Sequence, residues 1–506
     1  MDLYLQGHDY RYAVEQMLMT LFPGQRPRYP DGEPGSAQPA ALLTLSQADN
    51  TLTAQATLWW EGSAYQAVQS APRPQDGTEQ AAEGLRRQLV RLAFYQAGVA
   101  ALGQEPPWGA LTGVRPVKLP TRVLAQGGST QQAHDLLTQR YRVTPSRADL
   151  AVECAQAALS VQRTLNPSQM SLYLGIPFCP SRCAYCSFIS ADVKGALALV
   201  EPYVDALCQE IAAAGEALRR EGITIPTAYF GGGTPTTLSA PQLDRVLTAL
   251  CTHLPMEDCY ELTVEAGRPD TITADKLAVL RRHGVHRISI NPQTMEDTVL
   301  RRMGRAHTAQ DIRQAMALAR QHFGGLVNMD LIAGLPGDTP QGFARTLHEV
   351  LAMDPANITV HTLALKKGAR LMEEQGALCA PHEVAEMLAL AESTLRGAGY
   401  APYYLYRQKY MSGSFENVGW AKPDTLCAYN IVMMEELQSV LSLGAGGVTK
   451  LVNPRTGEIR RLSNPKFPRE YLDALPRLCA DKAQAAAFQA QLAAQAANPP
   501  CQRESL

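Results

Sequence analysis

The chain has 506 residues, 46% of them hydrophobic, and a formal net charge of −2 from 46 basic and 48 acidic residues. This length exceeds the roughly 250–300 residues that one hydrophobic core supports, so we expect two or three domains. The balanced charge excludes a protein that coats nucleic acid. Residues 1–8 lack the pattern of a signal peptide, and no uncharged apolar run approaches ~18 residues, so we expect a cytoplasmic protein without a membrane partner.

Residues 1–165 are expected to form an α+β domain. Apolar and polar residues alternate from about residue 40 to residue 72, around the turn-like pair Asp49-Asn50, which predicts a small antiparallel sheet. From about residue 78 to residue 163, apolar residues recur every three to four positions, which predicts helices. The segment carries no paired carboxylates, metal-ligand spacing or phosphate loop, so we expect a lid or a packing platform.

Residues 166–375 alternate between short apolar strands and longer amphipathic helices. Six strands are predicted, at residues 171–176, 227–230, 261–265, 287–290, 326–332 and 357–363, with helices between them such as 200–220, 308–321 and 340–353. Repeated βα units predict a parallel sheet, curved or partly closed. Enzymes with such sheets bind ligands at the carboxyl ends of the strands, so functional motifs should follow the strands directly.

Residues 376–506 are expected to form a mostly helical extension that covers the substrate side. The pattern predicts a helix at residues 381–396, an aromatic segment at 400–410, a glycine-rich turn at 444–447 and an Ala/Gln-rich surface helix at 483–497.

Three of the eleven cysteines, Cys179, Cys183 and Cys186, follow directly on the first predicted strand with the spacing C-x3-C-x2-C. An odd number of cysteines without a secretion signal indicates reduced thiols. Iron–sulfur clusters are held by thiolates, and a four-iron cluster with three protein ligands leaves one iron free to bind another molecule. The alternatives are three unrelated thiols or a zinc site, but zinc requires a fourth ligand, and no histidine lies between residues 175 and 220. The triplet predicts a [4Fe–4S] cluster.

A glycine-rich turn at residues 231–235, with the sequence GGGTP, follows the second predicted strand and lets the backbone approach a ligand closely. Further motifs follow in order: TVEA at residues 263–266, RISINPQ at 287–293, GRAHT at 304–308 and DLIAGLPG at 330–337. On these motifs and the cysteine triplet, the segment from about residue 171 to residue 447 is identified as a member of the radical S-adenosylmethionine (SAM) family. It resembles the coproporphyrinogen III oxidase (HemN) branch.

The resemblance implies a partial (βα)6 TIM-type barrel with a [4Fe–4S] cluster and SAM as cofactors. In this family the free iron chelates the amino and carboxylate groups of SAM, and an electron from the reduced cluster releases a 5′-deoxyadenosyl radical. Glu265, Gln293 and Asp330 would offer acceptors for ribose hydroxyls, and Arg305 a charge-assisted bond to the methionyl carboxylate. The implied SAM contacts are Tyr173, Tyr185, Gly232, Gly233, Thr234, Glu265, Gln293, Arg305, Asp330 and Ala364.

Two further motifs, LTGVRP at residues 111–116 and YLYRQK at residues 404–409, resemble the coproporphyrinogen dehydrogenase subgroup of this branch. The resemblance implies a tetrapyrrole substrate, two of whose propionates lose hydrogen, CO2 and an electron to become vinyl groups, giving protoporphyrinogen IX. It also implies a one-electron donor such as flavodoxin or ferredoxin. A substrate with several carboxylates needs cations, and we predict these anchors: Lys366, Lys367, Arg370, Arg407 and Lys409.

The sequence departs from the oxidase pattern at two positions. Gly175 lies where oxidases of the family commonly carry His, and Phe188 lies where established members have a fourth cysteine. The second difference is shared with family members that act as haem chaperones. Two alternatives therefore stay open, a haem-binding transfer protein and an anaerobic haem-degrading enzyme. Candidate axial ligands for haem are His286, His307 and His361.

Overall fold

The computed structural model describes residues 1–34, 39–74, 79–186, 191–192, 195–364, 369–372, 378–408 and 412–497. The chain divides into two compact units, of which the first comprises Met1–Val152 with Arg407–Phe415 and the second Glu153–Tyr406 with Glu416–Leu506. None of the helices in these described ranges is long and apolar enough to cross a membrane.

The first unit contains the antiparallel sheet that the alternating pattern predicts. Strands β2 (Ala40–Ala48), β3 (Thr51–Trp60) and β4 (Ser63–Pro72) form successive hairpins, and β1 (Asp2–Gln6), which was not predicted, adds to β2 in parallel. Helices α1 (Arg11–Leu21) and α2 (Glu79–Leu102) bury their apolar residues, among them Met17 and Phe94, in one core with Leu43 and Leu58 of the sheet. The unit also contains α3 (Lys118–Ala125), α4 (Thr130–Asp135), the π-helix η1 (Leu136–Arg140) and the start of α5 (Pro145–Gln162).

Arg407, from the second motif of the dehydrogenase subgroup, lies in this unit beside the first motif, which is far away in the sequence. The N–H of Arg407 donates to the carbonyl of Val114 at 2.8 Å, and its Nη1 donates to the carbonyl of Leu111 at 2.5 Å. The guanidinium also lies over the ring of Trp108, 5.5 Å from the ring centroid. Residues Arg407–Phe415 are thus tied into the first unit by Arg407.

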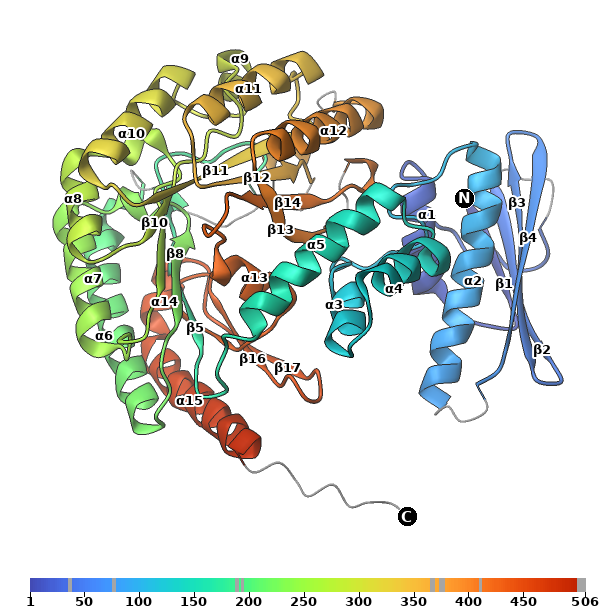
Figure 1. Ribbon diagram of the computed structural model, residues 1–506, viewed down its shortest axis with the longest axis horizontal. Helices are drawn as coiled ribbons and strands as arrows, with labels where there is room; N and C mark the ends of the chain where they lie inside the picture. The colour runs from blue at the N-terminus through green and yellow to red at the C-terminus, as the bar shows by residue number, and fades with distance from the viewer. Residues whose placement is uncertain are drawn as a thin grey trace. The chain divides into compact units, whose positions relative to one another are not determined.

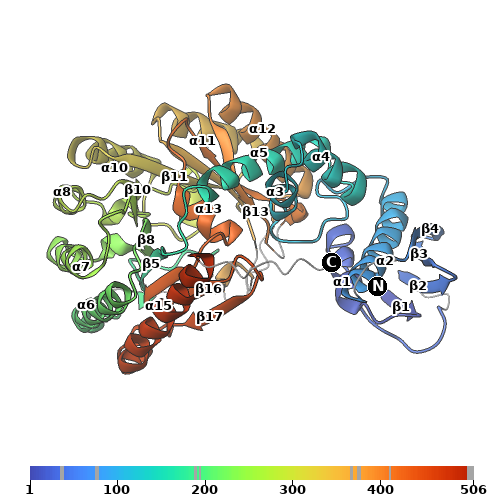
Figure 2. The same cartoon turned by 60° about the horizontal axis from the view of Figure 1, so that its bottom comes forward.

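The second unit is built on one large curved sheet in which the six predicted strands are parallel neighbours. They are β5 (Ser171–Ile176), β8 (Thr227–Gly232), β9 (Glu261–Glu265), β10 (Arg287–Ser289), β11 (Leu326–Ala333) and β12 (Asn357–Thr362). Helices cover its outer, convex side, as Figures 1 and 2 show: α6 (Leu197–Arg220), α7 (Ala240–His253), α8 (Ala274–Arg282), α10 (Ala309–His322) and α11 (Pro340–Ala352). The predicted fold class, an α/β partial barrel, is confirmed.

Polar residues cap the starts of four of these helices, and at α8 the Thr273 hydroxyl accepts a bond from the N–H of Lys276. Ser239 and Thr308 open α7 and α10 with capping boxes, and the Thr339 hydroxyl accepts a bond from the N–H of Gly342 at the start of α11. Apolar residues at helical spacing, such as Leu243, Val246 and Leu250 of α7, then face the sheet. The local sequence therefore fixes where each βα unit turns, and these turns form the edge on which the motifs lie.

The C-terminal extension has most of its regular structure in helices, as predicted, and it also adds five strands to the sheet. Strands β13 (Ala401–Tyr406) and β14 (Asn417–Ala421) extend the sheet beyond β12, while β15 (Val440–Gly444) pairs in parallel with β5 and continues into β16 (Val448–Val452) and β17 (Ile459–Ser463). The helices of the extension are α12 (Pro381–Gly397), α13 (Ala428–Glu435), α14 (Pro468–Asp473) and α15 (Leu475–Ala497). Smaller elements of the unit are β6 (Phe178–Cys179), β7 (Ala191–Asp192), α9 (Asp297–Arg302) and the 3-10 turns η2 (Pro235–Thr237), η3 (Pro269–Thr271) and η4 (Arg370–Met372). The 3-10 turn η5 (Ser412–Ser414) belongs to the first unit.

Candidate functional site

The segment that carries Cys179, Cys183 and Cys186, called the cysteine loop below, follows the carboxyl end of β5, as the sequence predicts. The N–H of Cys186 donates to the carbonyl of Cys183 at 3.2 Å, which closes a turn around the last two thiols. Between them, Ala184 donates to the carbonyl of Met303 at 3.0 Å and accepts from the N–H of Leu371 at 2.9 Å. The loop is thus held from both sides, and all three thiols are partly buried.

Two of the thiols contact polar side chains that follow other strands, Cys179 after β8 and Cys183 after β9. The Sγ of Cys179 lies 3.4 Å from the hydroxyl of Thr234, and Nη1 of Arg268 donates to the Sγ of Cys183 at 3.7 Å. Across the described ranges, no three His, Cys, Asp or Glu side chains converge on a single metal ion. A structural zinc site needs four such ligands around one ion, whereas the thiolates of a cluster bind separate irons. The geometry therefore gives no support to the zinc alternative.

The glycine-rich turn after β8 packs against the cysteine loop. The N–H of Gly233 donates to the carbonyl of Ile176 at 2.6 Å, and that of Thr234 donates to the carbonyl of Phe178 at 2.8 Å. A Cβ added at Gly233 would lie 2.5 Å from the Phe178 oxygen, and Gly232 has a φ of +108°. Only glycine satisfies both constraints at low cost. The close approach that the sequence predicts toward a ligand is thus made, in part, toward the chain's own cysteine loop.

Glu265, at the carboxyl end of β9, is held by an aromatic stack on the inner face of the sheet. The hydroxyl of Tyr229 donates to its Oε1 at 2.6 Å, and the Tyr229 ring stacks between Tyr173, at 6.4 Å, and Tyr429 of α13, at 4.8 Å. Burial raises the pKa of Glu265 to about 7, the Tyr229 hydrogen bond opposes this rise, and the charge of Asp330 adds to it. Tyr229 therefore connects Tyr173 and Glu265, two of the predicted SAM contacts, because it touches both.

We expect the stability of the protein without SAM to depend on pH through Glu265. Because the folded-state pKa is about 7 and the ordinary value is 4.5, the unfolded chain releases this proton first. The group's contribution is complete below pH 4.5 and is lost as the pH rises through 7, by roughly 3 kcal/mol. Thermal unfolding midpoints of wild type and Glu265→Gln between pH 4 and pH 8 measure this. The wild-type midpoint should fall relative to that of the variant, and parallel profiles would contradict the assignment.

Gln293 and Asp330 lie on neighbouring strand ends. The N–H of Gln293 donates to the carbonyl of Asp330 at 2.9 Å, and Gln293 has an unusual φ of +68°. Its side chain is buried, and its Oε1 has no hydrogen-bond partner among the described residues. A carboxylate oxygen of Asp330 lies 3.8 Å from Nε2 of His361 on β12, and the hydroxyl of Tyr406 lies 3.4 Å from Nδ1 of the same ring.

Arg305 carries a buried positive charge close to the cysteine loop. Its Nη1 donates to the carbonyls of Asn291 and Pro292 at 2.8 and 3.2 Å, and its Nη2 donates to that of Gly267 at 3.4 Å. These partners, its hydrogen-bond acceptors within the described ranges, are neutral. Its charge also acts on Tyr185: burial raises the pKa of this hydroxyl, and the nearby Arg305 charge opposes the rise.

These residues fit the predicted cofactors. A buried guanidinium without a carboxylate suits a ligand carboxylate, and a buried amide oxygen without a donor suits a hydroxyl or an amino group. Three partly buried thiols beside them suit a cluster with one free iron. Ala364, the last of the predicted contacts, lies two residues after β12.

The predicted substrate anchors have different outcomes. Lys366, Lys367 and Lys409 lie outside the described residues. Arg370 is exposed and lies beside the cysteine loop, because the N–H of the next residue, Leu371, donates to the carbonyl of Ala184 at 2.9 Å. The prediction for Arg407 is wrong, since only 8% of it is exposed and its guanidinium donates to the carbonyls of Leu111 and Ser414. That cation holds the first unit together instead.

The three histidines considered for haem differ in accessibility. His286 lies at the amino end of β10, where its Nδ1 accepts a bond from the N–H of Leu262 at 3.0 Å. His307 is 3% exposed, and burial lowers its pKa to about 3, so it is a neutral interior ring. His361 is partly exposed at the carboxyl end of β12.

The structure explains one departure from the oxidase pattern. A Cβ at Gly175 would lie 2.4 Å from the carbonyl oxygen of Ala445, and the hydroxyl of Tyr203 donates to the Gly175 carbonyl at 2.6 Å. The turn after β15 thus occupies the space that a side chain at Gly175 would need. The other departure, Phe188, lies outside the described residues.

Sequence reasoning missed Tyr229, Arg268 and Tyr429. Tyr229 precedes the glycine-rich turn by two residues, and Arg268 follows Glu265 by three, so both carried the positional signal of a strand end. Tyr429 carried no such signal, because it lies on α13 and reaches the site only through tertiary packing.

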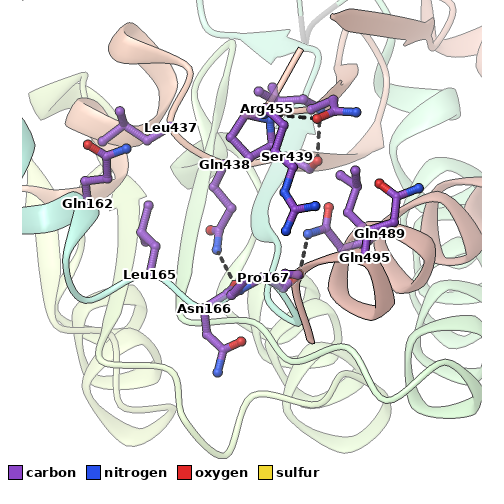
Figure 3. A pocket seen from close by; sticks show the side chains of 15 residues that line it. Gln162, Leu165, Asn166, Pro167, Leu437, Gln438, Ser439, Arg455, Gln489 and Gln495 are labelled. Carbon is purple, nitrogen blue, oxygen red and sulfur yellow. Dashed lines mark hydrogen bonds between the residues drawn. The ribbon is translucent and has the colours of Figure 1, made fainter. Parts of the chain in front are cut away.

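A cavity of ≈190 Å³ lies at the opposite, amino-terminal edge of the same sheet from the candidate site. Its lining includes Asn166 and Pro167 before β5 and Gln438 before β15, and Figure 3 shows Gln489 of α15 donating to the carbonyl of Pro167. This is the amino-terminal edge of the strands. Catalytic sites of such sheets lie at the carboxyl edge, so the cavity is not the candidate site.

Three thiols, a glycine-rich turn and buried polar residues lie at the carboxyl edge of the partial barrel, an arrangement that suits the class of proteins that combine a cluster with a bound cofactor. The family model for the radical SAM superfamily matches residues 173–350. The chain is 36% identical, over 86% of its length and 88% of the relative's, to the oxygen-independent coproporphyrinogen-III oxidase-like protein HemZ of Bacillus subtilis.

Two further similarities lie within the same superfamily. The heme chaperone HemW of Escherichia coli is 28% identical over 60% of this chain and 75% of its own. The solved structure of the Escherichia coli coproporphyrinogen III oxidase HemN, titled a radical SAM enzyme, aligns with a TM-score of 0.50 and 25% identity over 66% of this chain and 73% of its own. This chain therefore belongs to the radical SAM superfamily, in the HemZ family of oxygen-independent coproporphyrinogen III oxidase-like proteins. Membership implies a [4Fe–4S] cluster and SAM as its cofactors.

Proposed function

We propose that this protein converts two propionate side chains of coproporphyrinogen III into vinyl groups without oxygen, giving protoporphyrinogen IX. For each propionate, one hydrogen atom, CO2 and one electron leave, and the electron passes to an acceptor. The observation that carries the proposal is the 36% identity to HemZ over 86% of this chain, a length that extends well beyond the barrel. A chain that shared only the barrel would share only the cofactors.

In this proposal the chain's own residues hold the two cofactors at the carboxyl edge of the sheet. Cys179, Cys183 and Cys186 hold the cluster, and Arg305 binds the methionyl carboxylate of SAM. When both are bound, cluster and SAM supply a 5′-deoxyadenosyl radical that removes hydrogen from the substrate. The remaining proposed SAM contacts are Tyr173, Tyr185, Gly232, Gly233, Thr234, Glu265, Gln293, Asp330 and Ala364.

In this proposal, Glu265 and Asp330 bind the ribose hydroxyls of SAM. Ionised Glu265 accepts a hydroxyl proton more strongly than its neutral form, and its pKa of about 7 keeps both forms populated at neutral pH. We assign Arg370, exposed beside the cysteine loop, to a substrate propionate. A one-electron donor such as flavodoxin or ferredoxin reduces the cluster in this scheme.

An anaerobic assay tests the proposal. Reconstituted protein is incubated with SAM, a strong reductant and coproporphyrinogen III, and the products are measured by mass spectrometry. The expected result is loss of two CO2 per tetrapyrrole together with 5′-deoxyadenosine. Formation of 5′-deoxyadenosine with an unchanged tetrapyrrole would reject the substrate while leaving the cofactors in place.

Haem transfer is the second candidate, because the chain is also similar to the heme chaperone HemW. The accessible His361, with Asp330 and Tyr406 at its two ring nitrogens, is the residue that could bind haem iron. Tight haem uptake that His361→Ala removes, combined with unchanged coproporphyrinogen, would favour this candidate over the oxidase.

A further inference from the structure

Arg268 is the buried cation that touches a cluster thiol. It lies at the carboxyl end of β9, and only 4% of it is exposed. Its Nη1 donates to the Sγ of Cys183 at 3.7 Å and to the carbonyl of Ser181 at 3.5 Å, and its Nη2 donates to the Ser181 hydroxyl at 3.1 Å. The guanidinium thus faces the segment between the first two cysteines.

An ion pair fixes the orientation of this guanidinium. Nε and Nη2 of Arg268 donate to the two carboxylate oxygens of Asp270 at 3.1 and 3.4 Å. The backbone is held as well, because the hydroxyl and the N–H of Thr271 both donate to the Arg268 carbonyl. Asp270 therefore occupies one side of the fork and leaves Nη1 for Cys183.

Arg305, a second buried arginine near the loop, makes no such contact with a thiol of the described residues. Its Nη1 and Nη2 donate to three backbone carbonyls, as a residue with a positioning role toward an organic ligand would. Arg268 instead directs a charged donor at sulfur. Hydrogen bonds to the sulfurs and the net charge around a cluster are two of the factors that set its reduction potential.

We propose that Arg268, oriented by Asp270, is a positioning residue that raises the reduction potential of the cluster through its charged hydrogen bond to Cys183. Positive charge beside the thiolate stabilises the reduced cluster, which carries one more electron. This makes the cluster accessible to a one-electron donor. The inference rests on the proposed ligation by Cys183, but it is independent of which tetrapyrrole is bound.

The test is a redox titration of the cluster, followed by electron paramagnetic resonance, in reconstituted full-length protein. Arg268→Gln should lower the ratio of reduced to oxidised cluster about tenfold at a fixed solution potential, since a hydrogen bond to a charged group contributes on that order. For one electron this is a shift of about 59 mV toward more negative potential. Arg268→Lys, which keeps the positive charge, should shift the potential less than Arg268→Gln does.

Asp270→Asn gives the decisive comparison, because it removes the negative charge and leaves Arg268 in place. The potential should then move in the opposite direction, toward less negative values. Damage to the loop would move both variants the same way or would change iron content alone. Arg282→Gln, on the exposed face of α8, is the matched control and should leave the potential unchanged.

Opposite shifts in Arg268→Gln and Asp270→Asn support the proposal, and equal potentials in all cluster-loaded variants overturn it. If Arg268→Gln does not bind iron, Asp270→Asn decides alone: an upward shift supports the proposal and an unchanged or lower potential overturns it. Iron analysis of Cys183→Ala tests the underlying ligation separately, so failure there is distinguishable from failure of the tuning role.

Discussion

Cys183→Ala is expected to lose the four-iron cluster and, with it, all SAM cleavage. Cys183 lies in the turn that Cys186 closes, and its Sγ accepts the bond from Arg268, so the remaining thiols cannot replace it. Loss of a residue that only supports a ligand costs about 10–100-fold in metal affinity, and loss of a ligand itself costs more. Iron content and the visible absorbance of the cluster should fall to background, and 5′-deoxyadenosine formation should fall by more than roughly 100-fold.

Cys259→Ala is the matched control for this substitution. Cys259 is a partly buried thiol before β9, and its Sγ donates to the carbonyl of Glu261 at 3.5 Å. Burial raises the pKa of Cys259 to about 12, so this sulfur stays protonated and is not a ligand. Iron content should match that of wild type. Equal iron loss in the two variants, or full iron in Cys183→Ala, would show that the triplet does not hold the cluster.

The sequence predicted the barrel well because its signals are local. Each of the six strands is a short apolar run. The cysteine triplet, GGGTP, TVEA, RISINPQ and DLIAGLPG each overlap or follow the end of such a strand, whereas GRAHT follows α9. The cysteine spacing depends on neighbouring residues only. Gly232 and Gly233 were also found from the sequence, although the structure adds a reason that the sequence did not contain, the contact of Gly233 with Phe178.

What the sequence could not predict depends on contacts between distant segments. Strand β15 pairs with β5, although most of the second unit's sequence lies between them, and no local pattern identifies that partner. Arg407 follows an aromatic strand like an available surface cation, yet Leu111 and Trp108, far away in sequence, bury it. Tyr229 and Arg268 reach Glu265 and Cys183 only because β8, β9 and the cysteine loop meet at one edge. Which side chains meet therefore depends on how neighbouring strands are aligned, and a motif within one strand does not contain that information.

Glu210→Ala is expected to destabilise the second unit by about 3–5 kcal/mol, because it leaves a buried cation without its partner. Glu210 of α6 is fully buried, and its Oε1 lies 2.9 Å from Nζ of Lys482 on α15, which is 2% exposed. Its Oε2 accepts bonds from the N–H of Gly444 at 2.7 Å and from the Tyr471 hydroxyl at 2.6 Å. Chemical unfolding, monitored with a probe in the second unit, measures the loss.

This network reaches the site through Gly444. A Cβ at Gly444 would lie 2.3 Å from the Gly175 carbonyl oxygen, so β15 is held against the strand that leads into the cysteine loop. Glu210→Ala should therefore release iron faster than wild type as well as unfold more easily. Both effects come from the unpaired charge of Lys482. The double variant Glu210→Ala/Lys482→Met lacks this charge and should therefore recover part of the stability.

The exposed ion pair between Arg313 and Glu349 supplies the control. Both side chains are more than a third exposed, so Glu349→Ala should cost less than about 1 kcal/mol and leave iron retention unchanged. If Glu210→Ala costs no more than Glu349→Ala, the buried network does not support the sheet. If it costs several kcal/mol but iron retention is unaffected, then the strand pair β5 and β15 is stable without it, and the cysteine loop depends instead on its own bonds to Met303 and Leu371.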